Sequence, residues 1–225
     1  MKTAIDIVIP TLNAGPTLAR TLAALPSHAD FAFSTTLCDG GSCDDTVEIA
    51  RRAGAAVVTA PAGRGGQLAA GAAAGGAPWL LFLHADTRLG EGAGDVIARF
   101  VASVAGKAGY FRLRFEAAER AARRVERLAA WRCRAFGLPY GDQGLLIART
   151  HYDRLGGFRP LPLMEDVDLV RRIGRNDLLP LEADAITSAA RYRRDGWWLR
   201  PLRNLTCLSL HFAGVPPQTL RRLYG

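Results

Sequence analysis

The chain has 225 residues and a formal net charge of +8, and this length predicts one domain, or one domain with an appendage. Hydrophobic residues make up 49% of the chain, which provides for a large core and excludes extensive disorder. Arginine supplies 27 of the 29 basic residues, which favours phosphate or carboxylate partners. Nucleic acid is not predicted as a partner, because no nucleic-acid-binding module is recognisable.

The first half of the chain alternates between apolar runs and helix-like segments. Strands are expected at residues 4–10, 31–38, 55–59 and 79–83, and helices begin near Pro16, Asp44 and Gln67. Proline suits the first turn of a helix, and acidic residues suit the positive end of the helix dipole. This alternation predicts an α/β fold with a single, mostly parallel central sheet flanked by helices.

The run at residues 79–83 is apolar throughout and ends abruptly in His84, Ala85 and Asp86. Such a run is typical of a strand buried on both faces of a parallel sheet. Open α/β sheets bind ligands beyond the carboxyl ends of their strands, so Asp86 is placed to hold a metal-bound phosphate. The alternative interpretation is that Asp86 only caps the next turn.

Polar residues also follow the two earliest strands, with Thr11 and Asn13 after the first and Asp39 after the second. The carboxyl ends of parallel strands share one sheet edge, so these residues and Asp86 are expected to form one site. No GxGxxG follows the first strand, and GxxxxGK[ST] does not occur. A dinucleotide-binding Rossmann site is therefore disfavoured.

The second half is expected to contain helices at residues 91–104 and 116–136 and strands at 109–115 and 145–148. In the longer helix the apolar residues near helical spacing are Ala118, Ala121, Val125, Leu128 and Ala135. Its other side carries Arg120, Arg123, Arg124, Arg127 and Arg134. One interpretation is a solvated basic face on a packed helix, and the other is a helix resting on an anionic membrane surface.

The last quarter of the chain places acids at a helix start and then becomes basic and aromatic. Glu165 and Asp166 open a helix, where acids often only complement the helix dipole. Arg191-Tyr192-Arg193-Arg194 and Trp197-Trp198 follow, and aromatic residues beside basic ones suit a membrane interface.

Several motifs taken in order resemble those of family 2 glycosyltransferases, which are inverting enzymes of the GT-A fold. The motifs are Ile9-Pro10-Thr11-Leu12-Asn13, Asp39-Gly40-Gly41-Ser42 with Asp44-Asp45-Thr46, His84-Ala85-Asp86, and Glu165-Asp166. More narrowly, Gly63-Arg64-Gly65, Phe82 to Thr87, Gly141-Asp142-Gln143-Gly144 and Met164 to Leu169 resemble a small bacterial subgroup labelled arsenosugar-biosynthesis glycosyltransferase. Nothing in the sequence indicates arsenic, so the acceptor stays open.

The resemblance implies a nucleotide-sugar donor, with UDP as the favoured nucleotide. Thr11 and Asn13 would lie beside the nucleotide, and Asp39 would accept a hydrogen bond from the imide N–H of the base. Arg64 would approach the base or the diphosphate, and Arg191 is a further donor-binding candidate. Asp86, with His84 as a second candidate ligand, would hold Mn²⁺ or Mg²⁺ against the diphosphate, where a divalent cation stabilises the charge of the leaving group.

On the acceptor side, the resemblance implies that Asp166 is the general base, with Glu165 beside it. Asp142 and Gln143 would contact the acceptor or the sugar. An inverting displacement needs one base to deprotonate the acceptor hydroxyl, and a lipid-linked acceptor is one option.

Three departures from the family pattern matter. The Asn that often precedes the helix glycine of the third motif is Ala69 in this chain. His84 replaces the first acid of the DxD motif, and an imidazole suits Mn²⁺ better than Mg²⁺. The QxxRW motif of processive synthases is absent, which favours the addition of a single sugar. Two alternatives stay open: a catalytically degenerate module that binds a nucleotide or a lipid, and a sugar-nucleotide pyrophosphorylase.

We expect a transferase domain at residues 1–190, with a nucleotide-binding half at 1–90 and an acceptor and catalytic half at 91–190. Residues 191–225 are expected to form a basic aromatic segment packed on or beside it. The four cysteines lack metal-site spacing, and neither a secretory signal nor an apolar run of about 20 residues is visible. These features predict a cytoplasmic protein, with peripheral contact to the inner membrane face as a further option.

Overall fold

In the computed structural model, which describes residues 2–104 and 106–224, eight strands form one sheet in the order β3-β2-β1-β4-β7-β6-β8-β5. The strands are β1 (Thr3–Thr11), β2 (Phe31–Asp39), β3 (Ala56–Thr59), β4 (Trp79–Phe82), β5 (Thr87–Leu89), β6 (Ala108–Phe115), β7 (Leu145–Ala148) and β8 (Leu178–Thr187). The first four pair in parallel, as do β6 and β8, whereas β7 and β5 pair only antiparallel. The mostly parallel α/β sheet predicted from the sequence is confirmed.

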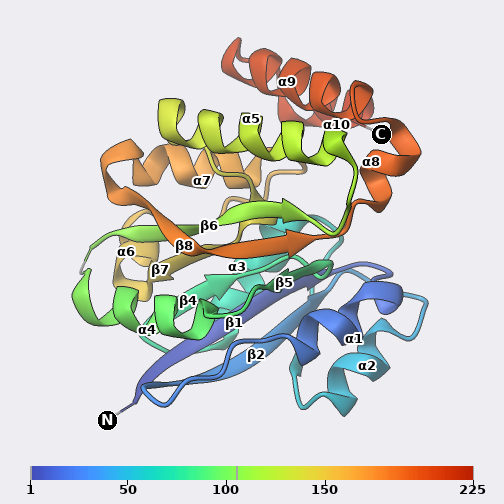
Figure 1. The fold of residues 1–225 in the computed structure, drawn as a ribbon. Helices are drawn as coiled ribbons and strands as arrows, with labels where there is room; N and C mark the ends of the chain where they lie inside the picture. The colour runs from blue at the N-terminus through green and yellow to red at the C-terminus, as the bar shows by residue number, and fades with distance from the viewer. Residues whose placement is uncertain (1, 105, 225) are drawn as a thin grey trace.

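Helices cover both faces of this sheet (Figure 1). The helices are α1 (Gly15–Ala23), α2 (Thr46–Arg52), α3 (Arg64–Ala74), α4 (Ala93–Ser103), α5 (Arg120–Phe136), α6 (Arg149–Arg154), α7 (Glu165–Ile173), α8 (Ala190–Asp195), α9 (Leu199–Phe212) and α10 (Pro217–Tyr224). Helices α1, α2 and α4 pack on one core, and α3, α7, α9 and α10 pack on the other. The chain therefore forms a three-layer arrangement with the sheet in the middle.

The two cores follow from the alternation of side chains along the central strands. In β4, Trp79 and Leu81 belong to one core, and Leu80 and Phe82 belong to the other. Both faces of β4 are buried, as the apolar run predicted, and each buried side chain contributes roughly 1.5–3 kcal/mol relative to an exposed one. This packing fixes β4 at the centre of the sheet and aims its carboxyl end at the residues that follow.

The long helix of the second half differs from its prediction at its start and on its buried face. It begins at Arg120 rather than at residue 116. Glu116 still extends the pairing of β6 with β8, because its N–H donates a hydrogen bond to the Thr187 carbonyl. Its buried residues are Ala122, Val125, Glu126, Ala129 and Cys133, so the predicted apolar face was wrong for Leu128, which is 53% exposed.

Glu126 explains which side of α5 is buried. Its carboxylate accepts a hydrogen bond from the Phe115 N–H at 2.8 Å and pairs with Arg114 and Arg123. A buried carboxylate is tolerated when charged and hydrogen-bonding partners surround it. The polar residue that sequence periodicity would place outside is thus turned inward, and apolar residues are left on the surface.

The C-terminal helices α9 and α10 pack through Cys207, Leu208 and Leu220 onto the core that also holds α3 and α7. Among the described residues, no helix combines the length and the apolar character needed to cross a membrane. All four cysteines are free thiols. The division into domains at residue 190 stays a prediction.

Candidate functional site

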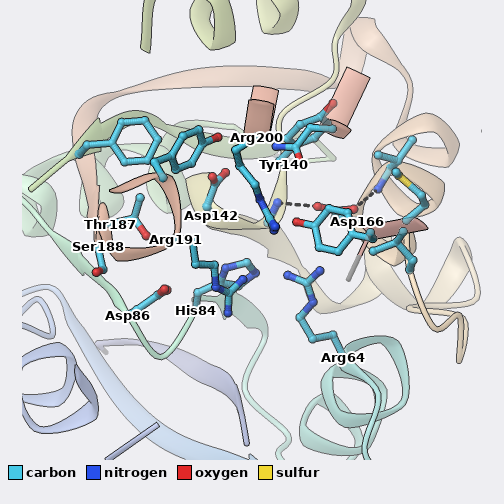
Figure 2. Close-up of a pocket in the computed structure, with 18 residues that line it drawn as sticks. Arg64, His84, Asp86, Tyr140, Asp142, Asp166, Thr187, Ser188, Arg191 and Arg200 are labelled. Atoms are coloured by element: carbon cyan, nitrogen blue, oxygen red, sulfur yellow. Dashed lines mark hydrogen bonds between the residues drawn. The ribbon is translucent and has the colours of Figure 1, made fainter. Parts of the chain in front are cut away.

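A pocket of about 90 Å³ lies beyond the carboxyl end of β4, where the sheet changes from parallel to antiparallel pairing (Figure 2). Its ionisable lining includes the predicted residues Arg64, His84, Asp86, Asp142, Asp166 and Arg191, together with Arg200. Ligand sites of α/β sheets occur at this kind of position. The structure thus brings six of the sequence-predicted residues into one cavity.

The turn after β4 sets the positions of His84 and Asp86. The Leu83 N–H still bonds to Val8 of β1, and the Thr87 N–H then bonds back to the His84 carbonyl at 3.1 Å. The Asp86 carbonyl accepts a hydrogen bond from Ser188 after β8. The turn is therefore held from both sides, with the His84 and Asp86 side chains in the pocket.

Asp166 is held at the start of α7 by backbone donors. Its Oδ2 accepts a hydrogen bond from Gly141 and its Oδ1 accepts one from Val167, each at 2.8 Å. A Cβ atom at position 141 would lie 2.6 Å from His84 Nε2, so glycine is needed for this approach. Met164, directly before the helix, has φ +65°, a left-handed conformation that is uncommon for a residue with a side chain, and strained residues of this kind cluster at functional sites.

Asp142 lies beside Asp166 but has a different environment. Its Oδ1 is buried and has no hydrogen-bond partner among the described residues. Burial raises the pKa of Asp142 to about 6, Asp166 adds to the increase, and Arg132 opposes it. Its carboxylate is therefore free to accept a hydrogen bond from a ligand.

Gln143, which was predicted to contact the acceptor or sugar, does not line this pocket. Its Nε2 donates to the Phe111 carbonyl, and its Oε1 accepts from Arg132, Cys133 and Tyr140. The side chain is only 2% exposed. The prediction is corrected because these internal hydrogen bonds turn the carboxamide into the core.

Glu165 turns away from the pocket that Asp166 lines, so it is a neighbour of Asp166 in the chain but does not line this pocket. Its Oε1 accepts a charged hydrogen bond from Arg64 Nε at 2.9 Å, and its Oε2 is buried without a partner among the described residues. Burial raises the pKa of Glu165, and the positive charge of Arg64 partly offsets the increase. Successive residues of a helix point about 100° apart, so Asp166 faces the pocket and Glu165 faces α3.

The surroundings of His84 favour a neutral imidazole by lowering its pKa. Burial lowers its pKa well below the ordinary value, and the positive charges of Arg64 and Arg191 lower it further. The Asp86 carboxylate has no hydrogen bond or ion pair among the described residues. A neutral imidazole and an unengaged carboxylate are both competent metal ligands.

The described residues contain no cluster of three or more protein ligands for a metal. Mg²⁺ and similar ions are often held by one or two carboxylates, with substrate phosphates completing the coordination. His84 and Asp86 therefore fit a metal that is shared with a bound diphosphate better than a metal that the protein binds alone.

The other predicted donor contacts lie at the ends of β1 and β2 and do not line this pocket. Thr11 donates a hydrogen bond to Asp39 at 3.1 Å, and Asn13 bonds to the backbone of Cys43. The Asp39 carboxylate also accepts hydrogen bonds from Ser42 and Gly41. Burial alone would raise the pKa of Asp39, but these hydrogen bonds outweigh it and lower the pKa below the usual range.

Several residues that line the pocket were not predicted from the sequence as site residues: Tyr140, Tyr192, Arg200, Asn204 and Tyr224. Arg200 pairs with Asp195 at 3.0 Å and stacks over the Tyr224 ring. Arg200 and Asn204 are one helical turn apart in α9, but this helix also carries Arg203, Thr206, Ser209 and His211, so no signal in the sequence singles out this pair.

Comparisons with known proteins identify the family and the fold of the chain. The family model described as "Glycosyl transferase family 2" matches residues 6–132, and no curated protein has significant sequence similarity to the chain. Among solved structures, the mannosyltransferase PcManGT from Pyrobaculum calidifontis, in complex with GDP-Man and Mn²⁺, has a TM-score of 0.67 at 16% identity and covers 100% of this chain and 68% of its own.

Two further solved structures are similar to the chain. S. aureus TarS 1–349 has a TM-score of 0.63 at 13% identity, over 100% of this chain and 69% of its own. Glucosyl-3-phosphoglycerate synthase from Mycobacterium tuberculosis, in complex with Mn²⁺, UDP and glucosyl-3-phosphoglycerate, has a TM-score of 0.57 at 19% identity, over 82% of this chain and 71% of its own. At such identities these likenesses establish the fold, and the predicted GT-A arrangement is confirmed.

Proposed function

Because this chain belongs to glycosyl transferase family 2 and is a glycosyltransferase, we propose that it transfers one sugar from a nucleotide-diphosphate sugar to an acceptor hydroxyl, with inversion at the anomeric carbon. The observation that carries this proposal is the meeting of three arginines and three carboxylates in one pocket after β4. The arginines are Arg64, Arg191 and Arg200, and the carboxylates are Asp86, Asp142 and Asp166. Arginine cations bind a diphosphate, and carboxylates serve as metal ligands and as proton acceptors.

On the donor side, we propose that the arginines bind the diphosphate. We propose that Asp86 and His84 bind a divalent metal, Mn²⁺ or Mg²⁺. When bound, the metal acts as a Lewis acid that stabilises negative charge on the departing diphosphate. The lowered pKa of His84 supports this assignment, because it favours the unprotonated ring nitrogen that a metal ligand needs. Solved structures that share the fold hold Mn²⁺ with UDP or with GDP-Man.

We assign Thr11, Asn13 and Asp39 to the nucleoside part of the donor, with UDP as the favoured nucleotide. Four hydrogen bonds already reach the Asp39 carboxylate, from Thr11, Gly41 and, twice, Ser42. A carboxylate offers about four lone-pair sites. The imide N–H of a base would therefore replace one of the two hydroxyl donors, Thr11 or Ser42, because a hydroxyl can rotate away without moving the backbone.

On the acceptor side, we assign the general base to Asp166 and the orientation of the incoming hydroxyl to Asp142. The two backbone N–H groups that hold Asp166 fix the direction of its carboxylate. The unpartnered Oδ1 of Asp142 accepts a hydrogen bond from the acceptor or the sugar. Glu165 is a positioning residue, because its contact is with Arg64 rather than with the pocket.

Calorimetry with UDP-glucose and GDP-mannose, with and without Mn²⁺, followed by a donor-hydrolysis assay, tests the proposal. We expect metal-dependent binding of at least one donor and slow metal-dependent release of its nucleoside diphosphate. A degenerate binding module, which the single acid of His84-Ala85-Asp86 favours, would bind the donor without turnover. Failure of both donors to bind with metal present would refute the proposal.

We also propose peripheral contact with an anionic membrane on the cytoplasmic face, through α5 and Trp198. Arg127 and Trp198 are exposed, with Trp198 at 70%, and Arg124 stacks over the Trp198 ring at 3.4 Å. Trp197 does not take part, because it packs against Phe115 and Tyr192. The narrower arsenosugar subgroup stays a prediction, and flotation with anionic vesicles tests the membrane contact.

A further inference from the structure

A groove of about 750 Å³ lies between α5 and α9, next to the catalytic pocket. Helix α5 contributes Leu128, Trp131 and Phe136, and α9 contributes Leu202, Leu205 and Phe212. These six side chains are between 47% and 60% exposed. Contiguous exposed apolar surface of this kind marks an interaction site, and the volume is within the range of ligand-binding cavities.

The groove continues into the catalytic pocket. Tyr140, Asp142, Tyr192 and Asn204 line both cavities. At this junction, the side-chain oxygens Asp142 Oδ1 and Asn204 Oδ1 are buried and have no hydrogen-bond partner among the described residues. A buried unpartnered acceptor costs about 1–3 kcal/mol, so the junction favours a ligand that brings hydroxyl donors to an otherwise apolar passage.

The charge around the groove selects the kind of ligand. Helix α5 and residues 190–224 together carry 13 arginines and two acidic residues, which gives a net charge of +11. The whole chain has a net charge of +8, so all the other residues together have a net charge of −3. A second copy of the chain would bring the same positive surface against itself. An anionic lipid surface has the opposite charge, and polybasic segments with interfacial aromatic residues bind such surfaces.

Cation–aromatic pairs are also found at the edge of the groove. The Arg124 guanidinium lies 3.4 Å from the centroid of the Trp198 ring, and that of Arg171 lies 4.9 Å from the centroid of the Phe212 ring. Trp198 and Phe212 both line the groove. Such pairs keep a cation beside an apolar surface, as contact with a lipid headgroup region requires.

We propose that the acceptor is a membrane lipid whose hydrocarbon chain lies in the groove between α5 and α9 and whose hydroxyl-bearing head reaches Asp142 and Asn204. This inference rests on the proposed function, since it names the acceptor class of the same site. In the transfer, the lipid hydroxyl oxygen forms a bond to the anomeric carbon, and the bond from that carbon to the diphosphate oxygen breaks. The electron pair leaves with the nucleoside diphosphate, and the hydroxyl proton passes to the Asp166 carboxylate.

The test uses alkyl glucosides as probes, because they combine hydroxyl-bearing heads with chains of graded length. Binding of hexyl, octyl and decyl β-D-glucoside is measured by calorimetry below their micelle concentrations. Each added methylene that enters the groove should lower the Kd about two- to fourfold, since a buried CH₂ is worth about 0.8 kcal/mol. A Kd that does not depend on chain length would overturn the proposal.

Matched surface variants locate the binding. Leu128→Ser and Leu205→Ser remove exposed groove residues, so folding is retained, and both should abolish the chain-length dependence. Leu199→Ser and Leu223→Ser change residues that are 64% and 53% exposed but lie outside the groove, and they should bind like the unchanged protein. Equal losses in both pairs would contradict the assignment of the groove.

Parallel measurements separate this inference from the proposed function. If UDP-glucose or GDP-mannose binds with Mn²⁺ but the glucosides show no chain-length effect, the lipid acceptor is wrong and the transferase proposal stands. If the glucosides bind through the groove but neither donor binds, the transferase proposal fails. Sedimentation that shows a dimer abolished by Leu128→Ser and Leu205→Ser would assign the groove to a second copy of the chain instead.

Discussion

The substitution Asp166→Asn tests the proposed base most directly, because it keeps the shape of the side chain and removes the proton acceptor. A positioned general base contributes about 10²–10⁴-fold to a rate, so turnover of the sugar-transfer or donor-hydrolysis reaction should fall by this factor. Binding of the nucleotide should change little, since Asp166 contacts the backbone of Gly141 and Val167 rather than the arginines.

The same substitution has a cost in stability that can be derived from the structure. Both Asp166 oxygens accept N–H bonds at 2.8 Å, and an asparagine places its NH₂ group against one of these donors. Loss of one hydrogen bond to a charged group costs about 1.5–3 kcal/mol, and an acid in the first turn of a helix adds about 0.3–1 kcal/mol. The melting temperature of a chain of this size shifts by about 2–4 °C per kcal/mol, so rates must be measured well below the transition.

Two further substitutions in α7 serve as controls. Asp168→Asn removes an acid from the same helix that pairs with Arg159 and Arg172 and does not line the pocket. It should lower stability and leave turnover unchanged. Glu165→Gln weakens the contact with Arg64 and should affect KM for the donor more than kcat.

The assay is initial-rate release of nucleoside diphosphate at saturating donor, with melting curves recorded for each variant. Retention of kcat in Asp166→Asn, together with its loss in Glu165→Gln, would reverse the assignment. If neither variant lowers kcat, the base lies elsewhere, and Asp142, with a pKa raised to about 6, is the next candidate.

Three other substitutions should each change one measurable property. Asp86→Ala should abolish the Mn²⁺ dependence of UDP-sugar binding in calorimetry, and equal metal-assisted binding in this variant would contradict the assignment. Asp142→Asn should remove a low-pH limb near pH 6 from the kcat/KM profile. Burial raises the pKa of Asp142 from 3.8 to about 6, so the folded state of the unchanged protein should lose stability as the pH rises between these two values. The variant should not show this loss. Glu126→Gln should lower the free energy of unfolding by about 1–3 kcal/mol in urea titrations, since it removes the charge that Arg114 and Arg123 pair with; an unchanged midpoint would refute that account.

The sequence was sufficient to predict the parallel half of the sheet and the sheet edge at which His84 and Asp86 lie. The run at Trp79–Phe82 is buried on both faces as expected, and His84 and Asp86 follow it at the edge of the sheet. These features depend on local patterns, an apolar run and the polar residue that ends it, which a single sequence shows directly.

Features that depend on non-local pairing could not be predicted in this way. The antiparallel insertion of β7 between β4 and β6 brings Asp142 next to Asp166, and strand order is not encoded in periodicity. The internal position of Gln143 and the contact of Glu165 with Arg64 could not be seen in the sequence, because their partners Phe111 and Arg64 are distant along the chain. Leu128 was expected inside because a buried carboxylate was not considered at Glu126, and the groove was therefore missed.

The charge balance of the pocket explains why metal and donor should bind together. The formal charges of its three arginines and three carboxylates cancel, and His84 is neutral. Burial already shifts His84 and Asp142 toward their uncharged forms, so an added uncompensated charge is costly there. A diphosphate or a divalent cation alone would bring such a charge, whereas the two together largely compensate each other. By linkage each should raise the affinity of the other by the same factor, and this coupling is what Asp86→Ala is expected to remove, leaving metal-independent binding of the nucleotide through the arginines.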